Sequence, residues 1–242
     1  MEILILFDID GTILQMKQGV SKDIFSKFLI ELFGKDIQDK HIPGFHGMTD
    51  LQIIKEIALN INYPFHQIEA NLMEIWQKLS DDFVKYCTKD NIDLLPGAAE
   101  LIELLHNDSR VKLGLLTGNI KRNAYAKLDV YDLGRYFPVG AFGDDSFDRN
   151  ELPEIAFKRA NSYYENSNFS GENSMLTGDS PRDIECGKIN SISVLAVASG
   201  WSDKEELAKH NPEYLFDDFS DYKEVYHTII NHFDNEENHN SN

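Results

Sequence analysis

The sequence predicts an α/β protein with a parallel β-sheet, into which a helical unit is inserted near the start of the chain. Short apolar segments bounded by turn residues alternate with helical patterns, which is typical of a parallel sheet covered by helices on both faces. The first two strand-like segments are separated by about a hundred residues, far more than a strand–helix–strand crossover needs. The excess length predicts the insertion.

The strands and helices of the core are expected in alternating order. The apolar runs predict strands at Ile3–Phe7, Val111–Leu116, Val139–Phe142, Ser174–Thr177, Ser193–Ala198 and Tyr214–Phe216. The amphipathic patterns between them predict helices at Ala98–His106, Arg122–Leu128, Leu152–Tyr164 and Asp183–Ile189. Ligands of such sheets bind beyond the carboxyl ends of the strands, where Asp8, Thr117 and Asp179 fall.

The inserted stretch, Gln15 to Asp93, has almost only helical patterns, such as "TDLQIIKEIALNI" and "FHQIEANLMEIWQKLSDDFVKYC". The chain returns to the core at Pro96 and Gly97, which mark the start of a helix. We therefore expect an α/β core formed by residues 1–14 and 94–233 and an all-helical cap formed by residues 15–93. The polar residues 234–242 predict a disordered tail.

Composition and charge limit the classes of partner. The chain has 41 acidic and 23 basic residues, a net charge of −18, so a nucleic-acid partner is not expected. A small anionic substrate stays possible, because one basic residue or a metal ion can reverse the field in a cleft. Cys87 and Cys186 lack metal-site spacing, and the chain shows neither a signal peptide nor a membrane-spanning apolar run. We expect a cytoplasmic monomer or homodimer without a membrane partner.

The stretch "ILILFDIDGTIL" places two aspartates, Asp8 and Asp10, at the end of the first strand. Asp10–Gly11 alone is typical of a solvated turn, and burial of two adjacent carboxylates is unfavourable. A turn at Gly11 can instead direct both carboxylates around one point above the sheet. Asp-x-Asp-Gly-Thr after an apolar strand is more restrictive than either feature alone.

Two later segments end strands with polar residues. Thr117, Gly118 and Asn119 close the strand "VKLGLL" and could bind phosphate through a hydroxyl and backbone N–H groups, or simply cap a helix. Asp179 and Asp183 in "LTGDSPRDIE" could hold a divalent cation, or could cap a helix and favour its first turn.

These three segments, in this order, resemble the motifs of the haloacid dehalogenase superfamily, most of whose members are phosphatases. The arrangement is most similar to the phosphoglycolate phosphatase-like branch, which implies a Rossmann-like core with a helical cap. The third family motif departs from the usual pattern, a Lys before Pro-x-Pro. In "GDDSFDRNELPEIAFKRA" we assign that role to Arg149, with Lys158 as the alternative, although Arg and Lys differ in geometry.

The resemblance implies a mechanism. Mg²⁺ would offset the charge between a carboxylate nucleophile and a phosphoryl group, held by the carboxylates of Asp8 and Asp179 and the backbone carbonyl of Asp10, with Asp183 orienting or ligating. Asp8 would attack phosphorus and form an aspartyl-phosphate, while Asp10 would move the proton. Thr117, Gly118 and Asn119 would bind the phosphoryl oxygens, and Arg149 would offset their charge.

The inserted cap is expected to read the rest of the substrate, a small phosphorylated metabolite. In "HIPGFHGMTDLQII" we assign substrate contacts to His46 and Thr49. Thr49 and Gln52 also fit a helix capping box, and His46 also fits an ordinary loop.

Three other functions stay open. A phosphomutase acting on sugar phosphates would use the same residues. A haloacid dehalogenase is disfavoured by Asp10, which such relatives generally lack. A non-enzymatic phosphoacceptor domain also gathers Asp, Thr and a cation at strand ends, but it lacks the helical insertion and the Asp-x-Asp-Gly-Thr pattern.

Overall fold

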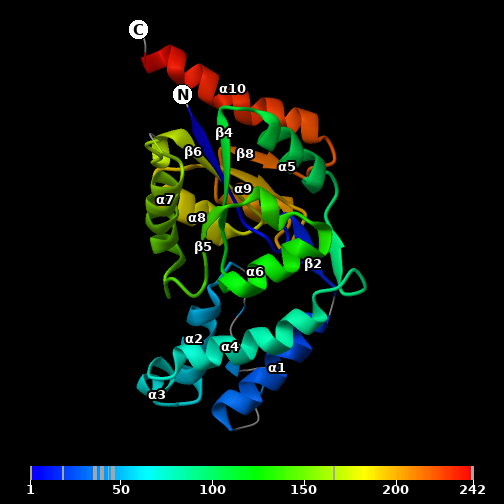
Figure 1. Ribbon diagram of the computed structural model, residues 1–242, viewed down its shortest axis with the longest axis vertical. Coiled ribbons are helices and arrows are strands. Elements are labelled where there is room, and N and C mark those ends of the chain that lie inside the picture. The colour runs from blue at the N-terminus through cyan, green and yellow to red at the C-terminus, as the bar shows by residue number, and fades with distance from the viewer. Residues whose placement is uncertain are drawn as a thin grey trace.

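The computed structural model describes residues 2–17, 19–34, 37–38, 41–42, 44, 47–165 and 167–240. Its centre is a six-stranded sheet in which every neighbouring pair of strands is parallel. The strands are β1 (Ile3–Phe7), β4 (Val111–Leu116), β5 (Val139–Ala141), β6 (Ser174–Gly178), β7 (Ser193–Val197) and β8 (Tyr214–Phe216). Their order across the sheet is β5-β4-β1-β6-β7-β8, so β1 lies between β4 and β6 (Figure 1).

The structure confirms the predicted α/β class and all six predicted strands, with ends that differ by one residue at most. It adds a short antiparallel pair, β2 (Leu14–Met16) and β3 (Ile92–Leu94), where the chain leaves and re-enters the core. Each of these two strands has a polar residue at its centre, Gln15 or Asp93, so neither forms the apolar run that predicted the equally short β5 and β8. This pair fixes the two ends of the inserted stretch next to each other.

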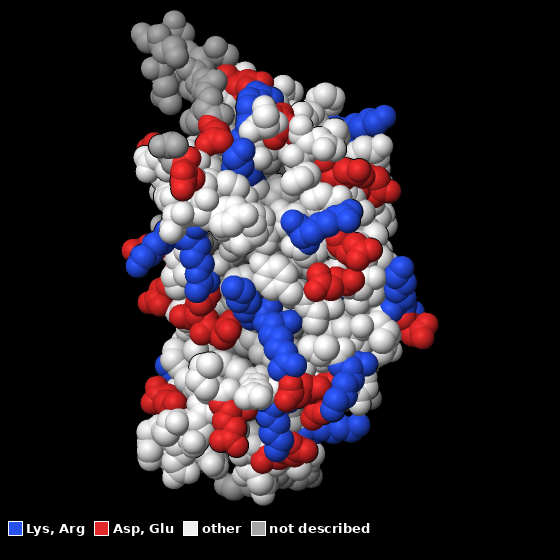
Figure 2. Space-filling view, viewed as in Figure 1, with Lys and Arg blue, Asp and Glu red and all other residues white. Residues whose placement is uncertain are grey.

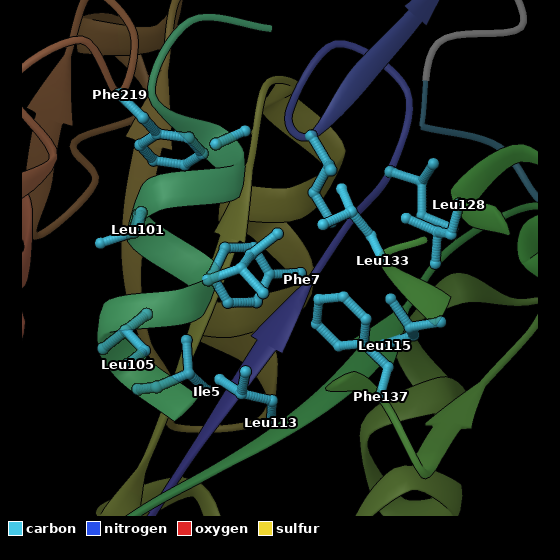
Figure 3. Packing of buried hydrophobic residues seen from close by; sticks show 14 of the residues in the cluster. Ile5, Phe7, Leu101, Leu105, Leu113, Leu115, Leu128, Leu133, Phe137 and Phe219 are labelled. Atoms are coloured by element: carbon cyan, nitrogen blue, oxygen red, sulfur yellow. The ribbon is translucent and has the colours of Figure 1, made fainter. Parts of the chain in front are cut away.

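Helices cover both faces of the sheet, as predicted. One face packs on α5 (Ala98–Asn107), α6 (Lys121–Leu128) and α10 (Tyr222–Asn240), and the other on α7 (Leu152–Tyr163), α8 (Pro181–Ile189) and α9 (Lys204–Lys209). Figure 3 shows the first of these two cores, in which Phe7 lies between α5 and Phe137. The rings of Phe7 and Phe137 meet edge to face with centroids 5.7 Å apart.

The described residues of the inserted stretch form four α-helices, which lie beyond one end of the sheet (Figure 1). They are α1 (Val20–Phe33), α2 (Asp50–Asn60), α3 (Phe65–Glu69) and α4 (Leu72–Phe83), which we call the helical unit. The helical unit has an apolar core of its own, and Ile120 of the sheet domain packs into that core. Single 3₁₀ turns complete the fold at Val84–Tyr86, Asp129–Tyr131, Gly134–Tyr136, Arg149–Glu151 and Gly171–Asn173.

The C-terminal segment differs from its prediction. Residues 234–240, predicted to be disordered, continue helix α10, while residues 241 and 242 lie outside the described part of the chain. The continuation begins with an ion pair to the body of the protein, since Asp234 Oδ1 lies 2.9 Å from Nη1 of Arg110. Polar helix formers can extend a helix whose first turns are packed, which composition alone does not reveal.

Among the described residues, no helix is both long and apolar enough to cross a membrane. The face in Figure 2 shows Lys and Arg side chains intermingled with Asp and Glu, without a continuous basic area on that face.

Candidate active site

The predicted aspartates and Thr117 meet at one edge of the sheet. Asp8 directly follows β1, Thr117 follows β4 and Asp179 follows β6. Because β4 and β6 flank β1 and all three run parallel, their carboxyl ends bring these residues together. Carboxylate oxygens of Asp8, Asp179 and Asp183 lie within 4.8 Å of one another, and all three residues are buried.

The turn after Asp8 fits closely against Asp179. The carbonyl of Ile9 accepts hydrogen bonds from the N–H groups of Ile13 (2.9 Å) and Leu14 (3.1 Å), which folds the chain back on itself. Gly11 has a φ of +80°, and a Cβ atom there would lie 2.3 Å from Oδ2 of Asp179. Both the left-handed backbone and the close approach therefore require glycine at this position.

Arg149 is the cation beside the acidic cluster. It is 4% exposed, and its Nη2 lies 3.4 Å from Oδ1 of Asp8 and also binds Asp183. Burial acts to lower the pKa of Arg149, but the negative charges of Asp183 and Asp8 outweigh this effect and raise it. The structure thus brings Arg149 to the predicted nucleophile, whereas the alternative, Lys158, is exposed.

Arg149 has unused hydrogen-bonding capacity. Its Nη2 donates to the carbonyl of Leu116 (3.2 Å), but Nε and Nη1 are buried without a hydrogen-bond partner among the described residues. Buried guanidinium donors without partners are unfavourable, so the geometry favours an anionic group beside Asp8. A phosphoryl group supplies the acceptor oxygens that these donors lack.

The negative charges of Asp8 and Asp179 are only partly balanced by positive groups nearby. Burial is the main cause that raises the pKa of Asp8 to about 7, and Asp183 and Asp10 raise it further against the effect of Arg149. The pKa of Asp179 is raised well above its ordinary value by burial and by the charges of Asp183 and Asp8. A divalent cation bound to these oxygens would remove this repulsion, and an all-oxygen donor set fits Mg²⁺.

Asp183 differs from the other two acids because both of its oxygens are already engaged. Oδ1 binds Arg149, and Oδ2 accepts hydrogen bonds from the N–H (3.0 Å) and the hydroxyl (2.6 Å) of Ser180. Ser180 caps α8 in return, since its hydroxyl accepts from the N–H of Asp183. These contacts fit Asp183 for orienting Arg149 and the turn after Asp179, one of the two roles that the sequence left open.

Asp10 lies in a different environment, with Lys127 as its partner. Nζ of Lys127 lies 2.8 Å from Oδ1 and 2.6 Å from Oδ2 of Asp10, and it also donates to Oδ1 of Asn119 (2.7 Å). Nδ2 of Asn119 donates to Oδ2 of Asp10 (2.8 Å). Lys127 is 4% exposed, so this ion pair is shielded from water on the lysine side.

Lys127 was not among the residues predicted from the sequence, although its spacing gave one signal. Asn119, Asn123 and Lys127 are spaced four residues apart, which places them along one face of α6 and the turn before it. A polar stripe on a helix that packs against the sheet is unusual and indicates a lined site.

The Thr117–Gly118–Asn119 turn contributes unequally to the site. Gly118 and Asn119 line the cavity above Asp8. Thr117 is fully buried, and its hydroxyl accepts from the N–H (3.3 Å) and from Nδ2 (2.9 Å) of Asn119. In the structure the Thr117 hydroxyl therefore positions Asn119, and its predicted contact with a phosphoryl group stays a prediction.

The helical unit contacts this turn directly. The N–H of Asp50 donates to the carbonyl of Gly118 (2.8 Å), and the N–H of Ile120 donates to Oδ2 of Asp50 (3.0 Å). A Cβ atom on Gly118 would lie 2.0 Å from the carbonyl oxygen of Met48, so this approach requires glycine. Burial raises the pKa of Asp50 to about 6, partly offset by the hydrogen bond from Ile120.

The two residues predicted to contact substrate from the helical unit have different outcomes. His46 lies outside the described residues. Thr49 does not line the cavity: its hydroxyl accepts the N–H of Gln52 (3.1 Å) as the N-cap of α2 and donates to the carbonyl of Phe147 (3.2 Å). Capping and docking of α2 thus engage the Thr49 hydroxyl, and its predicted contact with substrate stays a prediction.

A cavity of about 550 Å³ lies between the sheet edge and the helical unit. Its floor includes Asp8, Asp10, Arg149 and Asp179, and its walls include residues of β2, α1, α2, α4 and α6 and of the loops between elements. Cavities of this size hold small organic ligands, so the acids, Arg149 and a substrate have room to meet here.

Comparison with known proteins agrees with this geometry. The sequence model of the haloacid dehalogenase-like hydrolases matches residues 5–197 of the chain. A phosphoglycolate phosphatase of Vibrio parahaemolyticus is 22% identical over 224 residues, which cover 92% of this chain and 95% of that relative. A phosphoglycolate phosphatase of Salmonella paratyphi A is 26% identical over 149 residues, or 62% of this chain. The match spans only 57% of the length of that Salmonella relative.

Solved structures show the same fold. A β-phosphoglucomutase of Clostridium difficile aligns with a TM-score of 0.71 at 18% identity, over 96% of this chain and 99% of that one. A hydrolase of Pseudomonas syringae aligns with a TM-score of 0.65 at 20% identity, over 97% and 99% of the two chains. These alignments extend across the inserted stretch as well as the sheet.

Proposed function

Because the chain belongs to the haloacid dehalogenase-like hydrolases, we propose that it is a Mg²⁺-dependent phosphatase of small phosphate monoesters that works through an aspartyl-phosphate on Asp8. The observation that carries the proposal is the pairing of Asp8 with Arg149, whose Nε and Nη1 have no partner among the described residues. A phosphoryl group placed above Asp8 would satisfy those donors and face the carboxylate that attacks it.

In the first step, an Asp8 oxygen forms a bond to phosphorus while the bond from phosphorus to the ester oxygen breaks. The leaving oxygen takes a proton from Asp10 and departs as the alcohol. Arg149 offsets the charge of the phosphoryl oxygens throughout. In the structure both oxygens of Asp10 accept from Lys127, so Asp10 must exchange one of these contacts for the leaving oxygen.

In the second step, a water oxygen attacks phosphorus and Asp10 takes the proton of that water. The bond between phosphorus and Asp8 breaks, which frees inorganic phosphate and restores both aspartates. The helical unit, acting as the cap, would exclude other water from the cavity during the first step.

The proposed metal site uses the carboxylates of Asp8 and Asp179 and the backbone carbonyl of Asp10, while Asp183 holds Arg149 and Ser180. When bound, Mg²⁺ would supply the positive charge that lets a carboxylate approach a phosphoryl group. The resident cation, Arg149, also binds Asp183, which supports the need for a second positive charge.

The proposal is tested with the full chain, Mg²⁺ and acetyl phosphate, a small and reactive phosphoryl donor. Wild-type protein should release phosphate and lose this activity in excess chelator, and Asp8→Asn should lower turnover by more than roughly 10⁴-fold, because the nucleophile is removed. Asp90→Asn, at an exposed position, is the matched control and should keep wild-type activity. Near-normal turnover by metal-loaded Asp8→Asn would contradict the assignment.

A phosphomutase would transfer the phosphoryl group to a second hydroxyl of a sugar. The likeness to the β-phosphoglucomutase of Clostridium difficile is one of fold, at 18% identity. Release of free phosphate from a sugar monophosphate, without a transferred isomer, would support hydrolysis over transfer.

A further inference from the structure

The cavity above Asp8 has an apolar side and a side with polar groups. Together these two sides indicate what kind of alcohol the phosphate of the substrate is attached to. We infer, resting on the proposed phosphatase function, that the substrate is a monophosphate of an uncharged, amphipathic alcohol. Such an alcohol has one nonpolar part and at least one hydroxyl or N–H donor, and it is larger than glycolate.

The side formed by the helical unit is apolar. It is built by Ile24 of α1, Ile53 of α2, and Leu79 and Phe83 of α4, together with Met48 before α2. Each of these side chains is less than 9% exposed, although each lines the cavity. A nonpolar group that displaces water from this wall gains binding free energy in proportion to the area it covers.

Elsewhere the cavity wall includes two amide oxygens without a described hydrogen-bond partner, one on α6 and one on β2. Asn123 is 3% exposed and lines the cavity, and its Oδ1 has no hydrogen-bond partner among the described residues. Oε1 of Gln15, which also lines the cavity, is likewise buried without a described partner. Buried amide oxygens that lack a donor are unfavourable, so this side favours a ligand with hydroxyl or N–H groups.

The charges around the cavity disfavour a second anionic group on the substrate. Among the described lining residues, the Lys127 ammonium is held by Asp10 and Asn119, and the Arg149 guanidinium lies beside Asp8 and Asp183. Lys17 also lines the cavity, and its Nζ already has an acidic neighbour, Oδ1 of Asp93, at 3.6 Å. Asp50 adds an acid on the side of the helical unit. A carboxylate or a second phosphate would meet Asp50 without a dedicated cation.

The size of the cavity agrees with these two sides. About 550 Å³ exceeds what a two-carbon acid and one phosphate would fill, and cavities of 300–1,000 Å³ commonly hold ligands of the size of a nucleoside. A nucleoside combines hydroxyl donors on its sugar with a flat base whose ring faces can cover apolar side chains, so it serves as a probe for both sides at once.

Four phosphate esters of primary alcohols test the inference with wild-type protein and Mg²⁺. Uridine 5′-monophosphate has both features, ribose 5-phosphate has the hydroxyls, n-hexyl phosphate has the nonpolar part, and 2-phosphoglycolate has a carboxylate in place of both. We expect kcat/KM to be highest for uridine 5′-monophosphate and at least tenfold lower for 2-phosphoglycolate. Equal or higher kcat/KM for 2-phosphoglycolate would overturn the inference.

A variant separates the polar side from general damage. Asn123→Leu removes the amide and keeps a side chain of similar size, so the ratio of kcat/KM for uridine 5′-monophosphate over n-hexyl phosphate should fall about tenfold. Lys121→Leu, on the exposed face of the same helix, should leave this ratio within twofold of wild type. An unchanged ratio in Asn123→Leu would refute the role of the amide, and Asn123→Ala repeats the test if the leucine variant folds poorly.

The two levels of inference fail in different ways. If wild-type protein releases no phosphate from acetyl phosphate or any of the four esters, the phosphatase function fails and this inference fails with it. If phosphate is released and Asp8→Asn abolishes the release, but 2-phosphoglycolate is the best substrate, the substrate class alone is wrong.

Discussion

The two sides of the cavity are built by different physical means. The sheet edge gathers Asp8, Asp179 and Arg149 from segments far apart in the chain, and the parallel strands fix their positions. The facing wall of the helical unit consists of side chains such as Ile53 and Leu79, which belong at once to the apolar core of that unit and to the cavity. In the proposed function, the sheet edge carries out the reaction and the helical unit selects the substrate.

This difference matters because charged groups and apolar groups tolerate substitution differently. Burying neighbouring carboxylates lowers the stability of the fold, so their presence in the folded protein indicates a functional site. A buried leucine stabilises an apolar core, so its burial alone does not indicate a functional site. Substitutions at the sheet edge should therefore abolish activity, whereas those in the helical unit should change stability or preference.

After the loss of the nucleophile Asp8, the largest expected effect is at Asp179. Asp179→Asn keeps the shape but removes one negative oxygen from the proposed metal site, so activity with Mg²⁺ should fall roughly 10³-fold. Without metal the same change relieves repulsion among Asp8, Asp179 and Asp183, so the variant should unfold at no lower urea concentration than wild type in chelator.

Steady-state phosphate release and urea unfolding, each with and without chelator, measure the two effects. Asp90→Asn serves again as the control at an exposed position. Loss of activity together with lower metal-free stability would indicate a structural role for Asp179 rather than a place in the metal site.

The second expected effect concerns Lys127, which contacts both an acid at the sheet edge and the helical unit. Its ammonium binds Asp10 and lies 5.3 Å from the centre of the Phe83 ring in the helical unit. Lys127→Met leaves Asp10 with only Asn119 among its described side-chain partners, so kcat should fall about 100-fold with a smaller change in KM. Phosphate release over a range of substrate concentrations separates the two constants.

Two further variants show whether the charge of Lys127 or only its volume matters. Lys127→Arg should recover part of the lost kcat, because it keeps the cation near Asp10. Lys121→Met, on the exposed face of the same helix, should behave as wild type. If Lys127→Arg is as inactive as Lys127→Met while both stay folded, a positioning role through charge would be wrong.

The same contrast explains how much the sequence could predict. The six strands of the sheet could be predicted from their apolar runs. The acids and Arg149 could be placed at the sheet edge because each stands where an apolar strand ends or a helix begins. Lys127 and Asn123 were missed, since their function depends on which face of α6 turns toward the cavity. The strands β2 and β3 were missed because a polar residue interrupts each of them, so they contain no apolar run.

At Thr49 the sequence leaves two roles open, a substrate contact and a helix cap. A polar residue next to a glycine-containing loop fits a substrate contact and a helix cap equally well in sequence. Only the position of α2 against Phe147 shows that the hydroxyl also docks the helix, and that contact spans 98 residues. Long-range docking of this kind leaves no local pattern.

A smaller effect is expected from pH through Asp50. Burial raises its pKa from an ordinary 3.8 to about 6, so the folded protein binds this proton more tightly than the unfolded chain does. The free energy of unfolding should therefore fall as pH rises through this range, by about 2 kcal/mol from Asp50 alone between pH 4.5 and 7.5. Asp50→Asn lacks this proton and should lose correspondingly less stability.

Urea unfolding of both proteins in chelator at the two pH values gives this difference directly. Other buried acids, such as Asp8, titrate in both proteins and cancel in the comparison. The same loss of stability in wild type and Asp50→Asn would show that Asp50 does not sense pH at the contact with Ile120.

The smallest expected effect tests whether the Thr49 hydroxyl serves only to cap and dock α2 or also contacts substrate. Thr49→Val removes the hydroxyl that caps α2 and binds the carbonyl of Phe147, so it should lower the free energy of unfolding by about 1–2 kcal/mol. Thr49→Ser keeps the hydroxyl and should lose less. Because Thr49 does not line the cavity, KM for any hydrolysed ester should stay within twofold of wild type in both variants. A large rise in KM for Thr49→Val at unchanged stability would instead place this hydroxyl on the substrate and confirm the contact predicted from sequence.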